Sequence, residues 1–132
     1  MKIFSMKSSP TKLLSKIGSL TANVPKLSLP WLKKKEVGFA LFFHNFSTFL
    51  GRSGLYLEDL YVMPEYRHQG IGTALFHELA RIAVARECGR LEWWCLDWNQ
   101  AGIDFYKGLG AEAMDEWTVY RLSGDTLQRL AE

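Results

Sequence analysis

Cysteine, proline and long apolar runs are all scarce in this chain of 132 residues. The two cysteines, Cys88 and Cys95, are too few for a disulfide framework, and their spacing is not that of a zinc site. No apolar run approaches the roughly 18 residues that a membrane-spanning helix needs. These absences argue against a disulfide-rich secreted scaffold and against an integral membrane protein. They favour a soluble, cytoplasmic protein with reduced thiols.

Acidic residues are missing from the first 35 positions, which hold eight lysines and three of the four prolines. We interpret residues 1–35 as a flexible basic leader with a short helical pattern around Leu13–Ile17. A targeting peptide is the alternative, although such peptides favour arginine and the leader has none. Residues 36–132 hold eight basic and 14 acidic residues, a net charge of −6. This acidic part suits a cationic ligand better than it suits nucleic acid.

Apolar and aromatic residues gather in two strand-like runs, 37–43 and Leu55–Met63. The polar and glycine residues 47–54 between the two runs indicate a turn. The runs are therefore predicted to form an antiparallel hairpin, and Pro64 ends its second strand.

A helical pattern follows the hairpin and leads to further strands. Apolar residues recur every three or four positions from Ile71, and Cys88-Gly89 supply the expected end of the helix. The run Leu91–Asp97 predicts a strand, which a helical connection makes parallel to the strand before it. A short helix is expected over Gln100–Lys107. The C-terminal part predicts strands near 111–114 and 117–122 and a last helix over 123–130, so the fold class is α/β with a mixed sheet.

The turn before the long helix has the sequence Arg67-His68-Gln69-Gly70-Ile71-Gly72. Two glycines after a basic residue, at the start of a helix, leave backbone N–H groups free to bind a diphosphate. A glycine-rich loop without a ligand is the alternative, because short glycine patterns often arise by chance. The strand before the turn and the helix after it favour the diphosphate site.

Several separate motifs resemble one protein family. The turn Arg67–Gly72, after a strand that ends in Val62-Met63-Pro64, is similar to the acetyl-CoA-binding motif of the GNAT superfamily of N-acetyltransferases. The segments Tyr56–Arg67, Asp97–Gln100 and Asp104–Lys107 resemble, more narrowly, the diamine and thialysine acetyltransferases related to spermidine/spermine N1-acetyltransferase.

The resemblance runs from about residue 37 to the C-terminus. It implies a GNAT-like mixed sheet with helices on both faces and an acetyl-CoA-binding domain over residues 36–132. Residues 1–35 lack the strand and helices that the family places first, so the N-terminal part is expected to be incomplete or remodelled.

Acetyl-CoA as co-substrate, without a metal, is what the resemblance implies for the cofactor. Its diphosphate would lie against the turn, and its pantetheine arm would follow the strand before the turn, with Asn99 on the far side. The implied cofactor-binding residues are Leu60, Tyr61, Val62, Arg67, His68, Gln69, Gly70, Ile71, Gly72, Thr73, Asn99 and Gly102.

Two proton-handling side chains are also implied. An alkylammonium must lose a proton before its nitrogen attacks a thioester, and the departing thiolate gains one. Glu58 matches the family's carboxylate that takes the first proton, directly or through water. Tyr106 matches the hydroxyl that protonates the thiolate. A surface charge at Glu58 and a packed aromatic at Tyr106 are the alternatives, and their occurrence together with the glycine turn favours catalysis.

Acidic and aromatic residues are the candidates for binding the amine: Glu58, Glu92, Trp93 and Glu116. Ordinary exposed charge is the alternative for the acids. The resemblance implies transfer to a primary amine of a small polyamine, diamine or lysine-like substrate. We expect direct transfer, because neither cysteine is adjacent to a base that would activate it. We also expect a homodimer, and the acidic charge and the lack of a long apolar run argue against nucleic-acid and membrane partners. A truncated, non-catalytic CoA-binding or interaction module is the competing interpretation.

Overall fold

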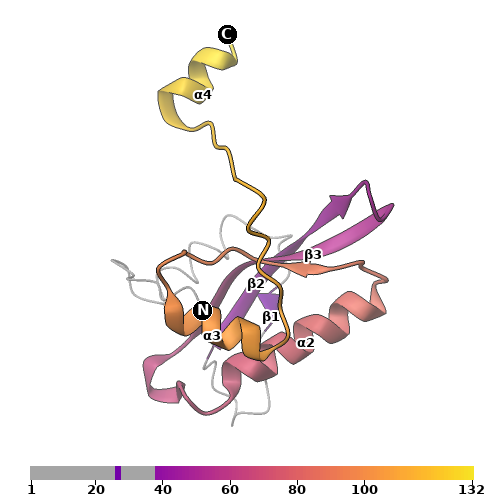
Figure 1. The fold of residues 1–132 in the computed structure, drawn as a ribbon, viewed down its shortest axis with the longest axis vertical. Helices are drawn as coiled ribbons and strands as arrows, with labels where there is room; N and C mark the ends of the chain where they lie inside the picture. The colour runs from indigo at the N-terminus through magenta and orange to yellow at the C-terminus, as the bar shows by residue number, and fades with distance from the viewer. Residues whose placement is uncertain (1–25, 28–37) are drawn as a thin grey trace.

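A computed structural model describes residues 26–27 and 38–132 of the chain (Figure 1). Most of the basic leader, with the helical pattern around Leu13–Ile17, lies outside the described residues. The described elements confirm the α/β class. In chain order they are β1 (Lys26–Leu27), β2 (Gly38–Ser47), β3 (Arg52–Val62), the 3-10 helix η1 (Pro64–Tyr66), α2 (Ile71–Ala85), β4 (Leu91–Glu92), α3 (Gln100–Gly108) and α4 (Gly124–Leu130).

One mixed sheet, in the strand order β1-β2-β3-β4, organises these elements. β2 pairs antiparallel with β1 and β3, whereas β4 runs parallel to β3. The parallel strands are connected through α2, so the predicted parallel crossover is confirmed. β1 lies within the leader that was expected to be flexible, and its Lys26 and Leu27 pair with Leu41 and Ala40. A strand of two residues is too short to show the alternation that marks strands in a sequence.

The β2–β3 hairpin is longer than its sequence pattern predicts. Ser47 and residues 52–54, expected in the turn, extend the two strands, and the turn shrinks to residues 48–51. The side chains at this end differ in burial, since Ser47 is 3% exposed whereas Arg52 is exposed. Gly51, with φ 66°, adopts the left-handed conformation that the tight reversal needs.

The pairing of β2 with β3 is interrupted at Glu58. The residues on either side of Glu58 pair with two consecutive residues of β2, Phe42 and Leu41. Glu58 is therefore an extra residue in β3, a β-bulge. The bulge resets the alternation of the strand, since Leu57 and Leu60 are both buried although they are three positions apart. Glu58 itself is exposed.

The hydrophobic core lies between one face of the sheet and α2. Leu55 of β3 and Leu75 and Leu79 of α2 are fully buried. Each such side chain contributes about 1.5–3 kcal/mol of transfer free energy. α3 joins this core through Tyr106, whose ring centroid lies 5.9 Å from that of Phe76 on α2. The core thus fixes the end of β3, the start of α2 and α3 relative to one another.

The end of α2 falls before the Cys88-Gly89 stop that the sequence predicts. Glu87 adopts the left-handed conformation with φ 56°. The N–H groups of Glu87 and Cys88 donate to carbonyls of the last helical turn at 3.0 and 2.8 Å, which closes α2 as a Schellman motif. Gly89 does not end the helix but makes room for the hairpin turn, because a Cβ there would lie 2.7 Å from the Leu50 side chain.

β4 is shorter than predicted. Its pairs with β3 are Leu55–Leu91 and Tyr56–Glu92, so the strand expected to continue to Asp97 stops after Glu92. Tyr56 is only the fifth residue of β3, and the rest of β3 runs on without β4 beside it. The two parallel strands are therefore paired over only two residues each.

The C-terminal segment differs most from its prediction. Strands were expected at 111–114 and 117–122, but residues 111–123 form neither helix nor strand in the described part of the chain. An alternating pattern makes a strand only where another strand pairs with it, and no pair involves this segment. The predicted last helix is confirmed as α4. The segment carries α4 away from the body of the molecule (Figure 1).

Candidate functional site

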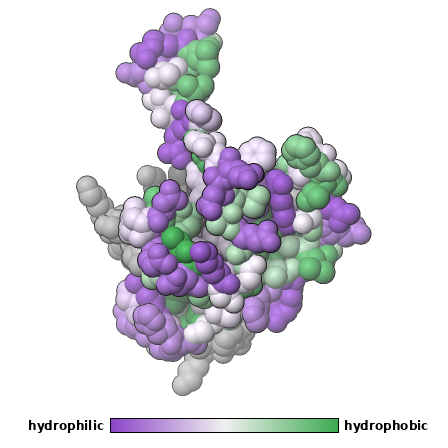
Figure 2. Space-filling model, viewed as in Figure 1, coloured by the Kyte–Doolittle hydropathy of each residue, from purple (hydrophilic) through white to green (hydrophobic). Residues whose placement is uncertain are grey.

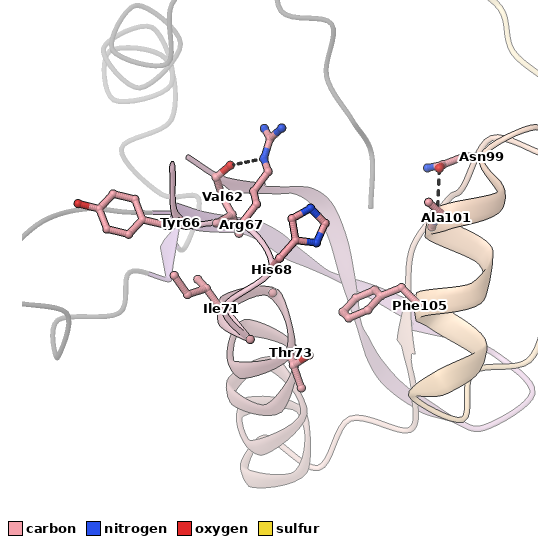
Figure 3. Close-up of a pocket in the computed structure, with 12 residues that line it drawn as sticks. Val62, Tyr66, Arg67, His68, Ile71, Thr73, Asn99, Ala101 and Phe105 are labelled. Atoms are coloured by element: carbon pink, nitrogen blue, oxygen red, sulfur yellow. Dashed lines mark hydrogen bonds between the residues drawn. The ribbon is translucent and has the colours of Figure 1, made fainter. Parts of the chain in front are cut away.

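A cavity of about 450 Å³ opens where β3 ends and α2 begins, facing the first turns of α3 (Figure 3). Its walls come from two parts of the chain that are distant in sequence. The lining residues are Val62, Tyr66, Arg67, His68, Gly70, Ile71, Gly72 and Thr73 from the first part, and Asn99, Ala101, Gly102 and Phe105 from the second. The predicted glycine turn and the predicted Asn99 segment therefore share one cavity.

The turn before α2 has the backbone shape of an anion-binding nest. His68 and Gly70 both have positive φ, 61° and 79°. Gly70 is the N-cap of α2, and no side chain bonds to the helix start. The N–H groups of residues 71–73, in the first helical turn, have no acceptor within the helix, and the helix dipole adds positive potential there. Diphosphate oxygens are suitable acceptors for these groups.

Arg67 holds the turn to β3 and brings a positive charge to the cavity. Its Nε donates to the Val62 carbonyl at 2.9 Å, and its guanidinium lies 5.7 Å from the centre of the Tyr61 ring. One N–H group thus fixes the side chain at the end of the strand. The guanidinium has no carboxylate partner among the described residues, so its charge is available to an anionic ligand.

Asn99 fixes the opposite wall. Its side chain is 7% exposed, and its Oδ1 accepts a hydrogen bond from the Gly102 N–H at 3.1 Å. This contact is an N-cap, and α3 accordingly begins at Gln100. The first turn of α3 is held in place across the cavity from the first turn of α2.

Three lining residues were not predicted: Tyr66, Ala101 and Phe105. The Phe105 ring points from α3 toward the start of α2 (Figure 3), and a Cβ on Gly72 would lie 3.8 Å from it. Phe105 comes three positions after the predicted Gly102, so helical spacing was the signal that could have located it. Tyr66 and Ala101 are marked only by their proximity in sequence to predicted residues.

Leu60, Tyr61 and Gln69, which were predicted to bind the cofactor, do not line the cavity. Leu60 is 4% exposed and belongs to the core. The Tyr61 ring supports Arg67, and the Gln69 side chain donates to the Glu65 carbonyl at 3.2 Å. The contacts predicted for Leu60 and Tyr61 are made by main-chain groups. The burial of their side chains therefore does not test these contacts.

The two predicted catalytic side chains have different surroundings. Glu58 is exposed at the bulge of β3. Tyr106 is 8% exposed, and its ring lies 5.1 Å from that of Trp93. Burial, and to a lesser extent the nearby Cys95, raises the pKa of the Tyr106 hydroxyl well above its ordinary value. The hydroxyl therefore keeps its proton at neutral pH, as a proton donor requires.

The four predicted substrate-binding residues have different surroundings. Glu92 pairs with Arg90 Nε at 2.7 Å and accepts from Asn45 Nδ2 at 3.1 Å. Trp93 packs its ring into the core beside α2. Glu116 is exposed on the C-terminal segment. Glu58, at the bulge, is the one that also carries a predicted catalytic role.

The cavity as a whole combines polar and apolar walls. The turn supplies N–H donors and the charge of Arg67, whereas Ile71 and Phe105 supply apolar surface. This combination suits an extended ligand with an anionic part. Within residues 26–27 and 38–132, no three His, Cys, Asp or Glu side chains are grouped as metal ligands. Among the same residues, every helix is too short or too polar to cross a membrane.

Comparison with known proteins gives one consistent result. The model of the Acetyltransferase (GNAT) family matches residues 21–111, which include β1 and both walls of the cavity. L-ornithine N5-acetyltransferase of Arabidopsis thaliana is 43% identical over 93 residues, which are 70% of this chain and 41% of the relative. Thialysine N-epsilon-acetyltransferase of Bos taurus is 42% identical over 98 residues, which are 72% of this chain and 57% of the relative.

One solved structure matches nearly the whole chain. It is an integron cassette protein from the mobile metagenome of V. cholerae, with a TM-score of 0.82 and 30% sequence identity. The match covers 96% of this chain and 80% of that protein. By contrast, the chain spans about half the length of the two curated relatives, 41% and 57%.

Proposed function

Because the chain belongs to the acetyltransferase (GNAT) family, we propose that it transfers the acetyl group of acetyl-CoA to a primary amine of a small diamine, polyamine or lysine-like molecule. The observation that carries the proposal is the cavity in which the glycine turn faces Asn99. Similarity to an ornithine and a thialysine acetyltransferase, at 43% and 42% identity, supports an amine as the acceptor.

The residues around the cavity fit acetyl-CoA, which carries a diphosphate and an extended arm with amide groups. The N–H groups of residues 71–73 and the Arg67 guanidinium would hold the diphosphate. Gly70 lets the turn adopt φ 79°, and the space beside it is open, since no atom lies within 4 Å of the position that a Cβ would take. The main chain of residues 60–62, which β4 does not cover, would bind the amides of the arm, with Asn99 opposite.

The chemistry needs one proton acceptor and one proton donor. Transfer forms a bond from the amine nitrogen to the acetyl carbon and breaks the bond from that carbon to sulfur; acetyl-CoA supplies the activated thioester. Glu58, exposed at the bulge, takes the proton that the nitrogen loses. Tyr106 donates its hydroxyl proton to the departing sulfur; burial raises the pKa of this hydroxyl, which keeps it protonated at neutral pH but makes it a weaker acid than an exposed tyrosine. Transfer is direct, without an acyl-enzyme.

Thiol release in the presence of amines tests the proposal. The chain is incubated with acetyl-CoA and a panel of diamines, polyamines and lysine-like amino acids, and free thiol is measured. We expect turnover with at least one amine and a loss of roughly 10²- to 10⁴-fold in kcat for Tyr106→Phe, the range for general acid catalysis. Glu58→Gln should lower the rate most at neutral pH, where the amine is protonated.

A non-catalytic CoA-binding module is the alternative that this experiment separates. Such a module predicts that acetyl-CoA raises the Tm while no amine releases thiol, and that Glu58→Gln changes nothing. A folded chain with that behaviour would contradict the enzymatic proposal and leave the module.

The proposal extends to the state of the protein in the cell. Residues 36–132 would form the acetyl-CoA-binding domain, to which β1 adds a strand. A cytoplasmic location is consistent with Cys88 and Cys95, which are free thiols. We also propose a homodimer, which would cover the exposed apolar side chains of the C-terminal segment.

A further inference from the structure

Four aromatic rings pack against one another where α3 meets α2. They belong to Phe76 of α2, Trp93 after β4, and Phe105 and Tyr106 of α3; we name them the aromatic cluster. The Trp93 ring centroid lies 4.9 Å from that of Phe76 and 5.1 Å from that of Tyr106, with interplanar angles of 66° and 60°. Edge-to-face packing of this kind depends on orientation, so each ring limits the tilt of its neighbours.

The Tyr106 ring is held by the other three members of the aromatic cluster. Besides Trp93, Phe76 lies 5.9 Å and Phe105 lies 5.6 Å from it, between ring centroids. The Tyr106 side chain is 8% exposed, and in the described part of the chain no hydrogen bond to its hydroxyl accompanies the ring contacts. The position of the hydroxyl is therefore determined by how the rings pack.

Trp93 belongs to a segment that runs beside the Tyr106 hydroxyl. Residues 93–96 form neither helix nor strand, and β3 does not pair with them. The segment meets Tyr106 through the Trp93 ring and again at Cys95, whose charge acts on the Tyr106 hydroxyl. Trp93 does not line the cofactor cavity. Its printed contacts thus join it to the predicted proton donor and to the core.

We propose that Trp93 is a positioning residue for Tyr106 and does not bind the amine. Its ring sets the tilt of the Tyr106 ring, and with it the point from which the hydroxyl gives its proton to the sulfur as the bond from carbon to sulfur breaks. The phenolate that remains regains a proton from water. This inference rests on the proposed acetyltransferase function and specifies how its proton donor is held.

Position matters here because proton transfer needs hydrogen-bond distance, about 2.6–3.2 Å between heavy atoms. A misplacement of about 1 Å costs roughly 100-fold in rate. Burial makes the Tyr106 hydroxyl a weaker acid than an exposed tyrosine. A weak acid in the wrong place would protonate the sulfur slowly, so loss of the Trp93 ring should affect the chemical step.

The separation of kcat from KM tests the inference. Thiol release is measured with the most active amine of the panel. Trp93→Leu should lower kcat by roughly 10- to 100-fold, while the KM for the amine and the Kd for acetyl-CoA stay those of the wild type. A residue that binds the amine would instead raise its KM at constant kcat. Trp93→Phe keeps a ring beside Tyr106 and should retain most of kcat.

Trp94→Leu is the matched control, because it is the same substitution at the next position. The Trp94 ring is 46% exposed and packs near Tyr56, at 6.0 Å between centroids. We expect its kcat to equal that of the wild type. Tm is measured on the same samples. If Trp93→Leu does not fold, Trp93→Met makes the same comparison, since its unbranched side chain fills irregular space.

A double variant separates positioning from a general structural effect. In the Tyr106→Phe background, Trp93→Leu should lower kcat no further, because the hydroxyl that the ring positions is gone. An equal factor in both backgrounds, or a raised amine KM at constant kcat, would overturn the inference and leave the acetyltransferase in place. So would a Tyr106→Phe chain as active as the wild type. A wild-type chain that acetylates no amine would overturn the acetyltransferase proposal, and this inference with it.

Discussion

At the scale of single residues, Gly70 is the position where backbone conformation and ligand binding meet. Its φ of 79° costs an L-residue about 1–2 kcal/mol. We expect Gly70→Ala to lose about this much unfolding free energy in urea titrations, and also to bind acetyl-CoA more weakly, because strain in the turn displaces the N–H groups of the nest. Binding is measured by calorimetry.

Gly51→Ala is the matched control for this prediction. Gly51 has φ 66° in the hairpin turn and, like Gly70, no atom within 4 Å of a Cβ position. It should lose a similar unfolding free energy while its affinity for acetyl-CoA stays that of the wild type. Equal affinities for the two variants would show that the turn before α2 does not hold the cofactor.

Tyr56 gives a residue-scale prediction about alkaline stability. Its pKa is raised from 10.0 to about 12, mainly by burial, so above about pH 10 the unfolded chain loses this proton while the folded chain keeps it. The folded state then binds more protons, and the free energy of unfolding falls as pH rises through this window. Tyr56→Phe lacks this contribution, so its unfolding free energy should fall less steeply between about pH 9 and about pH 11.

Urea titrations of the wild type and of Tyr56→Phe across that range make the measurement. Identical slopes in the wild type and in Tyr56→Phe would mean that the hydroxyl titrates equally in the folded and unfolded chains.

At the scale of elements, the bulge in β3 can be tested apart from the carboxylate that it carries. Removing Glu58 leaves Leu57, Asp59 and Leu60 in regular alternation, so the two leucines still face the core. Removing Asp59 instead gives the same straightened strand and keeps Glu58. We expect both deletions to fold, with losses of about 1–2 kcal/mol in unfolding free energy, and both to lose acetyl transfer.

The comparison of the two deletions with Glu58→Gln identifies which property matters. A chain without Asp59 that remains as active as the wild type would show that the carboxylate suffices and that the bulge does not position it. Thiol release and Tm are measured on the same samples.

The elements also differ in how well the sequence predicts them. The hairpin, α2 and the parallel crossover were predictable because each has a long periodic pattern of buried residues, such as Leu75 and Leu79 on α2. The bulge was not, because two adjacent acids, Glu58 and Asp59, fit a regular strand equally well. The end of α2 was misplaced because Gly89 is the stronger stop signal, although Glu87 adopts the left-handed conformation.

The sequence predicts part of the candidate site. Its cofactor wall follows from one local motif, the turn before α2, and Asn99 came from the resemblance to a family. The packing of half-buried Trp93 against the core and the exposure of Trp94 could not be predicted, because two adjacent tryptophans give no sign of which one packs inward. Strands at 111–114 and 117–122 were predicted from an alternation that specifies an extended segment but not its partner.

At the scale of the whole molecule, the C-terminal segment makes a prediction about assembly. Residues 112–132 are all exposed, and Figure 2 shows apolar surface on α4, set apart from the body. A helix of seven residues is marginal by itself in water. We expect a homodimer in which a second copy covers the large apolar side chains of this segment, namely Met114, Trp117, Val119, Tyr120, Leu122, Leu127 and Leu130.

Light scattering during size-exclusion chromatography measures the mass. Joint replacement of Trp117 and Leu127 by serine should shift the protein toward the mass of one chain, 15.1 kDa. Val84→Ser is the control, because Val84 is 77% exposed on α2 and lies outside the C-terminal segment. A wild-type chain of monomer mass at micromolar concentration would contradict the dimer.

The short pairing of β3 with β4 also has a consequence for motion. Only two residue pairs join these strands, whereas β2 and β3 are paired along nearly their whole length. Opening at β4 therefore breaks few main-chain hydrogen bonds, and local opening of this kind needs less free energy than global unfolding. Amide hydrogens of residues 91–97 should exchange with deuterium sooner than those in the middle of the hairpin, and a ligand that bridges β3 and α3 should slow them. The sheet would thus be rigid on the hairpin side and able to open on the side where the cofactor is expected to enter.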